Sequence, residues 1–157
     1  MNRIFTLLIL LFTGLGAGMA QDKESGNKEK MFREVREFKI KYLAQEMELS
    51  ESQTPKFIDL YDEMSASRDS CYRHVRKMEK NLKKSKDATE EEYQKVTEAM
   101  NEANVSYAEI EKVYDEKFAE FLSPKQIYMM KEAEQKFRSK LEGMRQDRKK
   151  REIRTKR

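Results

Sequence analysis

Two long stretches of the chain carry mostly apolar residues that are alternately three and four positions apart. The first contains Phe57, Tyr61, Met64, Arg68, Cys71, Val75, Met78 and Leu82. The second contains Tyr93, Val96, Met100, Ala103, Tyr107, Ile110 and Tyr114, and Phe118 and Phe121 continue the stripe. This spacing places the side chains along one face of a helix, as in coiled coils. We therefore predict two helices of about 30 residues, each about 45 Å long.

The segment between these two stretches is short and polar. Residues 83–88 contain no apolar side chain larger than that of Ala88. Thr89, with Glu92 three positions later, makes a capping box that starts the second helix. Because long helices joined by so short a link pack side by side in opposite directions, the pattern predicts an antiparallel helical hairpin.

Weaker apolar stripes at helical spacing precede and follow the hairpin. The first stripe lies within residues 31–47 and contains Phe32, Val35, Phe38, Tyr42, Leu43 and Met47. The second begins after Leu122 and contains Ile127, Met130, Ala133, Phe137, Leu141 and Met144. We therefore predict an all-α fold with four helices, the last of which frays beyond Gly143.

The chain begins with features typical of a secretory signal peptide. Arg3 supplies a positive charge, residues 4–15 are apolar, and residues 18–20 make a small-residue cleavage pattern. We predict that residues 1–20 are a signal peptide and that the chain is exported to the periplasm; an uncleaved anchor is the alternative. Residues 21–30 have no apolar side chain and are expected to form a disordered leader. The helical domain is then expected over residues 31–145, followed by a basic tail over residues 146–157.

Positive charge is concentrated in the predicted tail. Among residues 144–157 eight are basic and two are acidic, which gives a net charge of +6. Subtracting this segment and Arg3 from the net charge of +4 for the whole chain leaves −3 for residues 21–143. Such a tail suits an acidic protein, anionic lipid or nucleic acid, and export argues against nucleic acid. We expect a weak contact with an anionic membrane, although a solvated helix end explains the same composition.

The residue types needed for several folds and chemistries are scarce. The chain has five Gly and two Pro, too few for the turns of a β-sandwich or for a Rossmann or P-loop nucleotide site. With one His and no Cys-x-x-Cys or His-Glu-x-x-His motif, we predict no enzyme and no cofactor. Cys71 and His74, three residues apart on a helix, are weak candidates for metal ligands if a dimer partner supplied two more. The simpler interpretation of Cys71 is a small buried residue of the apolar seam, since a free Cys packs as a small hydrophobe.

One short motif occurs twice, each time directly after a predicted helix. Leu49, Ser50 and Gln53 belong to the sequence Leu-Ser-Glu-Ser-Gln. Leu122, Ser123 and Gln126 belong to the sequence Leu-Ser-Pro-Lys-Gln. In each copy the Ser hydroxyl is expected to accept a hydrogen bond from the N–H three residues on, while the Gln side chain accepts one from the Ser N–H.

The two prolines affect these copies differently. Pro124 falls at the first helical position of the second copy, where its missing N–H costs nothing. Pro55 falls five residues after Ser50 and removes an early helical hydrogen bond. The first copy is therefore expected to start its helix with an irregular turn, or with Thr54 as the cap.

An exported helical chain with two such motifs resembles the Spy/CpxP family of envelope proteins, whose motif is Leu-Thr-x-x-Gln. The resemblance covers roughly residues 31–145. It implies a long, thin, bent helical hairpin that pairs with a second copy into an antiparallel, cradle-shaped homodimer. It also implies either an ATP-independent periplasmic chaperone or a regulator of envelope stress signalling, and some related members bind metals.

Apolar and cationic residues outside the seams or at their edges are our candidates for client binding. They are Ile58, Arg68, Arg73, Arg76, Val113, Phe118, Tyr128 and Met129. With the resemblance, they lead us to expect a holding chaperone that binds unfolded proteins during envelope stress. The alternative is a regulator that senses a metal or binds the periplasmic part of a signalling partner.

Overall fold

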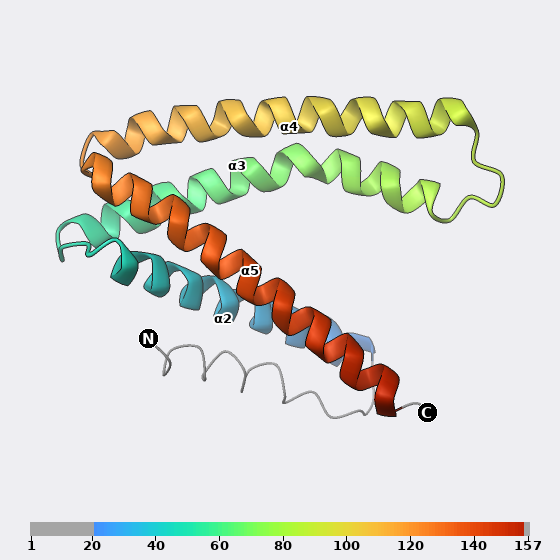
Figure 1. Cartoon of the computed structure of the whole chain (residues 1–157), viewed down its shortest axis with the longest axis horizontal. Helices are drawn as coiled ribbons and strands as arrows, with labels where there is room; N and C mark the ends of the chain where they lie inside the picture. Colours follow the sequence, from blue (N-terminus) through green and yellow to red (C-terminus); the bar gives the residue numbers. More distant parts are fainter. Residues whose placement is uncertain (1–20, 156–157) are drawn as a thin grey trace. The chain divides into compact units, whose positions relative to one another are not determined.

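The computed structural model describes residues 21–155, which form four helices and no strand (Figure 1). The helices are α2 (Gln21–Glu46), α3 (Gln53–Leu82), α4 (Glu90–Ala119) and α5 (Pro124–Thr155). The prediction of an all-α fold with four helices is therefore confirmed, and the predicted signal peptide lies outside the described residues. None of the described helices carries an apolar stretch long enough to cross a bilayer.

The chain divides into two compact units. One unit comprises residues 49–127, which include α3, α4 and the start of α5. The other comprises the chain up to Glu48 together with the chain from Tyr128 onward, so that it contains α2 and most of α5. The boundaries of these units therefore fall inside the region that the sequence suggested as one domain, residues 31–145.

In the first unit, α3 and α4 run side by side in opposite directions (Figure 1). Ring centroids of Phe57 and Phe118 are 5.8 Å apart, and the hydroxyls of Ser67 and Tyr114 are 3.2 Å apart. The connection at residues 83–89 ends in the predicted capping box. The N–H of Thr89 donates to Glu92 Oε2 at 2.9 Å, and the N–H of Glu92 donates to Thr89 Oγ1 at 3.2 Å.

In the second unit, α2 and α5 pack through aromatic rings and one ion pair. The Phe137 ring lies 6.1 Å from that of Phe38 and 5.9 Å from that of Tyr42. Lys39 Nζ donates to Glu134 Oε1 at 3.1 Å, so the buried carboxylate has a partner. Burial, followed by the charge of Glu46, raises the pKa of Tyr42. The chain runs in opposite directions along α2 and α5 (Figure 1), so this pair is antiparallel as well.

Both outer segments are more helical than the sequence suggested. The prediction of a disordered leader at residues 21–30 is wrong, because α2 begins at Gln21. The prediction that the last helix frays beyond Gly143 is wrong too, because α5 continues to Thr155. These segments are rich in Lys, Arg, Glu and Gln, which favour helix without a buried face. Side-chain pairs four residues apart, such as Arg148 with Glu152 at 2.8 Å, add to this preference.

Candidate functional site

Both copies of the Leu-Ser-x-x-Gln motif form the predicted reciprocal hydrogen bonds. In the first copy, the N–H of Ser50 donates to Gln53 Oε1 at 3.0 Å, and the N–H of Gln53 donates to Ser50 Oγ at 3.2 Å. In the second copy, the corresponding distances between Ser123 and Gln126 are 2.9 and 3.2 Å. Each motif thus satisfies two backbone N–H groups at the start of a helix.

The structure brings the two motifs into contact through their glutamines. Gln53 Nε2 donates to Gln126 Oε1 at 3.2 Å, and Gln126 Nε2 donates to Gln53 Oε1 at 3.1 Å. Gln53 Nε2 also donates to the carbonyl oxygen of Phe121 at 2.9 Å. We call Gln53 and Gln126 the glutamine clasp. It joins the start of α3 to the end of α4 and the start of α5, and sequence reasoning did not anticipate it.

The starts of the two helices differ in the way that their prolines require. α5 begins at Pro124, so Ser123 is its cap and Pro124 takes the first helical position, as predicted. α3 begins only at Gln53, after Ser52, which has helical dihedral angles and no side-chain capping bond. Of the two predicted arrangements for the first copy, the irregular first turn is therefore the one found. The motif leucines also differ, since Leu122 is buried and Leu49 is half-buried.

Two residues predicted to bind clients are instead part of the hairpin core. Phe118 has no exposed surface and lies against the rings of Phe57 and Phe121. Arg68 is 8% exposed. It pairs with Glu111 and lies 5.4 Å from the centre of the Tyr107 ring. The prediction is wrong for both residues, because the antiparallel packing of α3 on α4 covers these positions.

The other predicted residues are at least partly accessible and are divided between the two units. Arg73 and Arg76 are exposed on α3, and Arg76 pairs with Asp69 at 2.6 Å. Val113 is exposed on α4 and Ile58 is half-buried on α3. Tyr128 and Met129 belong to the other unit. There the Tyr128 hydroxyl donates to Glu132 Oε1 at 3.0 Å, and this bond raises the pKa of Tyr128.

A different set of apolar side chains is exposed along the half of the hairpin next to residues 83–89. Tyr93 is 51% exposed and Met100 is 41% exposed, although both belong to the seam of α4. Tyr107 follows on the same side of α4 and is half-buried against Tyr72 of α3, with ring centroids 5.9 Å apart. We call Tyr72, Tyr93, Met100 and Tyr107 the tip band.

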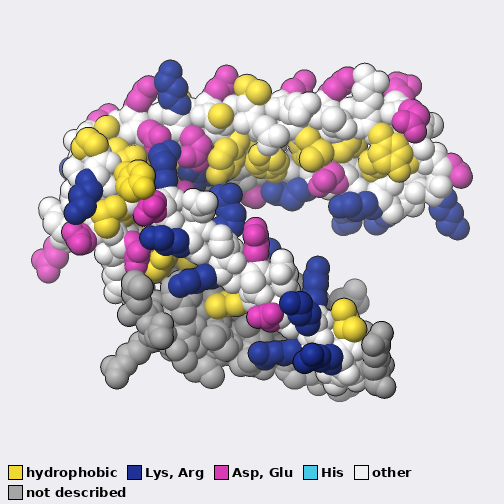
Figure 2. Space-filling model, in the orientation of Figure 1, with side chains coloured by type: hydrophobic (Ala, Val, Ile, Leu, Met, Phe, Trp, Pro, Cys, Tyr) yellow, Lys and Arg dark blue, Asp and Glu magenta, His cyan; other side chains and the backbone are white. Residues whose placement is uncertain are grey.

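Charged side chains border this apolar surface. Figure 2 shows hydrophobic side chains gathered along the boundary between α3 and α4, with Asp and Glu over α4 and Lys and Arg over α3. The hydroxyl of Tyr72 donates to Asn104 Oδ1 at 2.6 Å, which holds one edge of the band in place. The surface can therefore offer apolar contact while it stays hydrated at its edges.

Sequence reasoning missed the tip band because it sought exposed apolar residues outside the seams. Tyr93 and Met100 fit the seam spacing and were expected to be core. Tyr93, Met100 and Tyr107 are seven residues apart and so lie along one edge of the seam, whereas Val96 and Ala103 between them are buried. When a single helix packs against the seam, large side chains at the edge of the interface remain partly exposed to solvent.

The predicted weak metal ligands do not come together with others. The half-buried Cys71 donates from Sγ to the carbonyl oxygen of Ser67 at 3.4 Å, and His74 is exposed. Within the described residues, no three His, Cys, Asp or Glu side chains are grouped so that they would hold a metal ion.

A surface hollow lies between α2 and α5. It has a volume of about 250 Å³ and is lined by Phe32, Val35, Arg36, Lys39, Glu134, Phe137, Arg138 and Leu141. Apolar side chains from both helices therefore meet cations here too, in the unit that does not contain the tip band.

No protein-family model, curated protein or solved structure matches the chain. The resemblance to the Spy/CpxP family is therefore carried by the two motifs and the predicted signal peptide. Among the surfaces described above, the tip band is the one with exposed apolar side chains that an unfolded protein could bury.

Proposed function

We propose that this chain is an exported holding chaperone of the Spy/CpxP type, which binds partly unfolded proteins without nucleotide. The observation that carries the proposal is the tip band, where Tyr93 and Met100 remain half exposed on the face of α4 that packs against α3. Side chains of this kind bury well against an unfolded chain, because apolar area removed from water stabilises the complex. They also tolerate different partners, since Met is flexible and Tyr is amphipathic.

The charges around the band would keep this binding reversible. Exposed apolar surface that is continuous and dry favours aggregation, whereas here charged groups border it. Arg73 is exposed, and Arg76 and Asp69 pair at the surface. A client that buries only two or three half-exposed side chains gains little free energy, and it dissociates readily once it can fold.

The same proposal includes pairing with a second copy of the chain. The resemblance implies an antiparallel homodimer with a cradle-shaped face, and the hairpin of α3 and α4 supplies two long helices for such a pairing. Two copies would place two tip bands on one assembly. Avidity between them would then increase the affinity for clients that span both.

The experiment is an aggregation assay with purified protein and no nucleotide. An aggregating client is diluted from denaturant, and light scattering is followed with increasing chaperone. We expect aggregation of the client to be suppressed at a molar ratio of this chain to client between about one and several. No suppression at several-fold molar excess would remove the proposal.

A matched pair of variants locates the site. We expect the double substitution Tyr93→Ser and Met100→Ser to weaken suppression about ten-fold. Val105→Ser is the control, because Val105 is 60% exposed on the same helix and faces a different side from Tyr93 and Met100 by the 3.6-residue period. Equal loss in both variants, or no loss in the double variant, would show that the tip band is not the client site.

A further inference from the structure

The last three turns of α5 carry an unusual density of exposed positive charge. We call residues 144–155 the basic arm. It contains six basic residues (Arg145, Arg148, Lys149, Lys150, Arg151 and Arg154) and two acidic ones, Asp147 and Glu152. All six basic side chains are exposed. The arm therefore carries a net charge of +4, whereas residues 21–143 together carry −3, and the other dense group of exposed cations lies at residues 73–86.

The arm is a continuous helix rather than a loose tail. α5 runs without a break from Pro124 to Thr155. Gly143, at its base, has open space around the position that a Cβ would take, so no close packing requires a glycine there. An ion pair within the arm, Arg148 with Glu152 at 2.8 Å, neutralises a single cation. The remaining charges are therefore presented along a rod, and little ordering entropy is lost when they bind.

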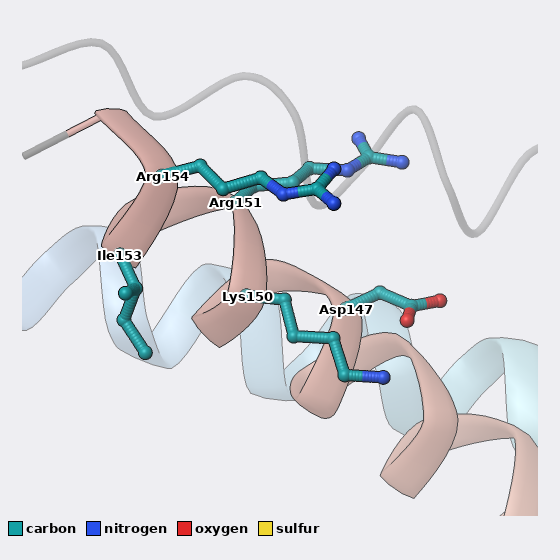
Figure 3. A pocket seen from close by; sticks show the side chains of 5 residues that line it. All are labelled: Asp147, Lys150, Arg151, Ile153 and Arg154. Carbon is teal, nitrogen blue, oxygen red and sulfur yellow. The ribbon is translucent and has the colours of Figure 1, made fainter. Parts of the chain in front are cut away.

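One large apolar side chain lies among these cations. Ile153 is 60% exposed, and Lys149 and Lys150 precede it by four and three residues, so they neighbour it on the helix surface. Figure 3 shows Ile153 on the side of α5 away from the guanidinium groups of Arg151 and Arg154. Asp147, Lys150, Arg151, Ile153 and Arg154 line a surface hollow of about 430 Å³.

We propose that the basic arm binds the surface of an anionic lipid bilayer, with Lys149 and Lys150 on headgroup phosphates and Ile153 beside them in shallow contact with the acyl region. Lysines beside an apolar side chain keep their ammonium groups at the headgroups while their stems lie against the lipid. Met144 and Ile153 are the arm's apolar residues, too few for deep insertion of an amphipathic helix. The arm therefore adsorbs by charge and is released by salt.

A lipid surface fits these residues better than a nucleic acid does. Proteins that hold single strands stack bases on aromatic side chains, and residues 138–157 contain no aromatic residue and no His. An exposed isoleucine gains nothing on a phosphate backbone, whereas it gains apolar contact at a bilayer. The proposal does not depend on the tip band, which belongs to the other unit.

The test is cosedimentation of the chain, purified after export, with vesicles. One vesicle set is an equal mixture of phosphatidylglycerol and phosphatidylcholine, and the other is phosphatidylcholine alone. We expect at least 50-fold tighter binding to the anionic set at 50 mM salt and loss of most binding at 500 mM. Each basic residue near the surface contributes about a five-fold factor.

Three variants separate the contribution of the arm's charge from that of charge elsewhere and from that of Ile153. Circular dichroism checks that each variant has the same helical content as the unchanged chain. The arm variant changes Arg148, Lys149, Lys150 and Arg151 to Gln, and it should bind at least about 25-fold more weakly, which is the product of the five-fold factors of Lys149 and Lys150. The control variant makes the same change of net charge at the exposed Lys83, Lys84, Lys86 and Lys112, and its binding should fall less than five-fold. Ile153→Ser should weaken vesicle binding about five-fold, which is the contribution of a partly inserted side chain.

The contrary results are equally definite. The lipid proposal is wrong if both vesicle sets bind alike, or if the control variant loses as much as the arm variant. It is also wrong if a 20-base-pair DNA duplex binds as tightly as anionic vesicles and Ile153→Ser changes neither. The aggregation assay should be unaltered in the arm variant, so failure of this proposal leaves the chaperone proposal untouched.

Discussion

In the half of the α3–α4 hairpin next to the glutamine clasp, Phe57, Met64 and Phe118 have no exposed surface. In the half next to residues 83–89, Tyr93 and Met100 are half exposed. Both halves have the same spacing of three and four residues. The difference teaches that spacing selects the face of a helix, whereas the number of neighbouring segments decides how much of that face is buried. Near the clasp, Phe121 and Leu122 add cover that the other half lacks.

The pair of Arg68 and Glu111 lies between these halves. A buried ion pair adds little net stability over an apolar pair, but breaking it leaves one charge buried alone. We infer that it holds α3 and α4 in a single register, because any shift of one helix along the other would separate the two charges. Substitutions along the hairpin should therefore lower the free energy of unfolding by amounts that decrease from the half next to the glutamine clasp to the half next to residues 83–89.

The largest effect is expected at Phe118. Phe118→Ala removes a ring packed between Phe57 and Phe121, and it should lower the free energy of unfolding by about 3–5 kcal/mol. Urea unfolding followed by circular dichroism measures the loss. Val113→Ala on the same helix is the control and should change stability by less than about 0.5 kcal/mol, because Val113 is exposed. A loss below about 1 kcal/mol for Phe118→Ala would mean that the half next to the clasp is not the stable half.

The next effect is expected at the ion pair. Arg68→Ala leaves Glu111 with a half-buried charge and should cost about 2–4 kcal/mol. Arg68→Met combined with Glu111→Leu should recover most of this loss, since both charges are then gone. Arg76→Ala breaks an exposed pair with Asp69 and should cost less than about 1 kcal/mol. Equal losses for Arg68→Ala and Arg76→Ala would contradict the buried role of Arg68.

A smaller loss is expected at the glutamine clasp. Gln126→Ala removes the bonds to Ser123 and Gln53 and should cost about 1–2 kcal/mol. A double-mutant cycle with Gln53→Ala measures the coupling between the two amides, which we expect near 1 kcal/mol. Gln94→Ala, which removes an exposed bond to Glu98, is the control. Strict additivity in the cycle would show that the two motifs act independently.

The smallest effect on stability is expected at the tip band. Tyr93→Ser with Met100→Ser should change the free energy of unfolding by less than about 1 kcal/mol, because neither side chain is buried. The same variant is expected to lose client binding, which light scattering measures, while its thermal unfolding stays almost unchanged. Phe118→Ala, in contrast, should show a large change in thermal unfolding. A large loss of stability in the Tyr93 and Met100 variant would remove the contrast between the halves.

Local features of the fold were accessible from the sequence. The spacing of apolar residues predicted the four helices, and Thr89 with Glu92 predicted the capping box that the structure contains. The bonds within each Leu-Ser-x-x-Gln motif were also predictable, since they join residues three apart. Such features depend on neighbours along the chain, so they can be inferred without knowledge of the fold.

Features that join distant residues were decided by the tertiary structure. The sequence by itself determined that there are four helices among the described residues, which local capping bonds form and which face of each helix is apolar; it did not determine that Gln53 meets Gln126, that Phe118 and Arg68 are covered, or that Tyr93 and Met100 are not. Burial is the sum of contacts from segments far apart in the chain, and two positions with the same spacing receive different numbers of them. The physical reason is that periodicity describes one helix, while exposure depends on how many others reach it.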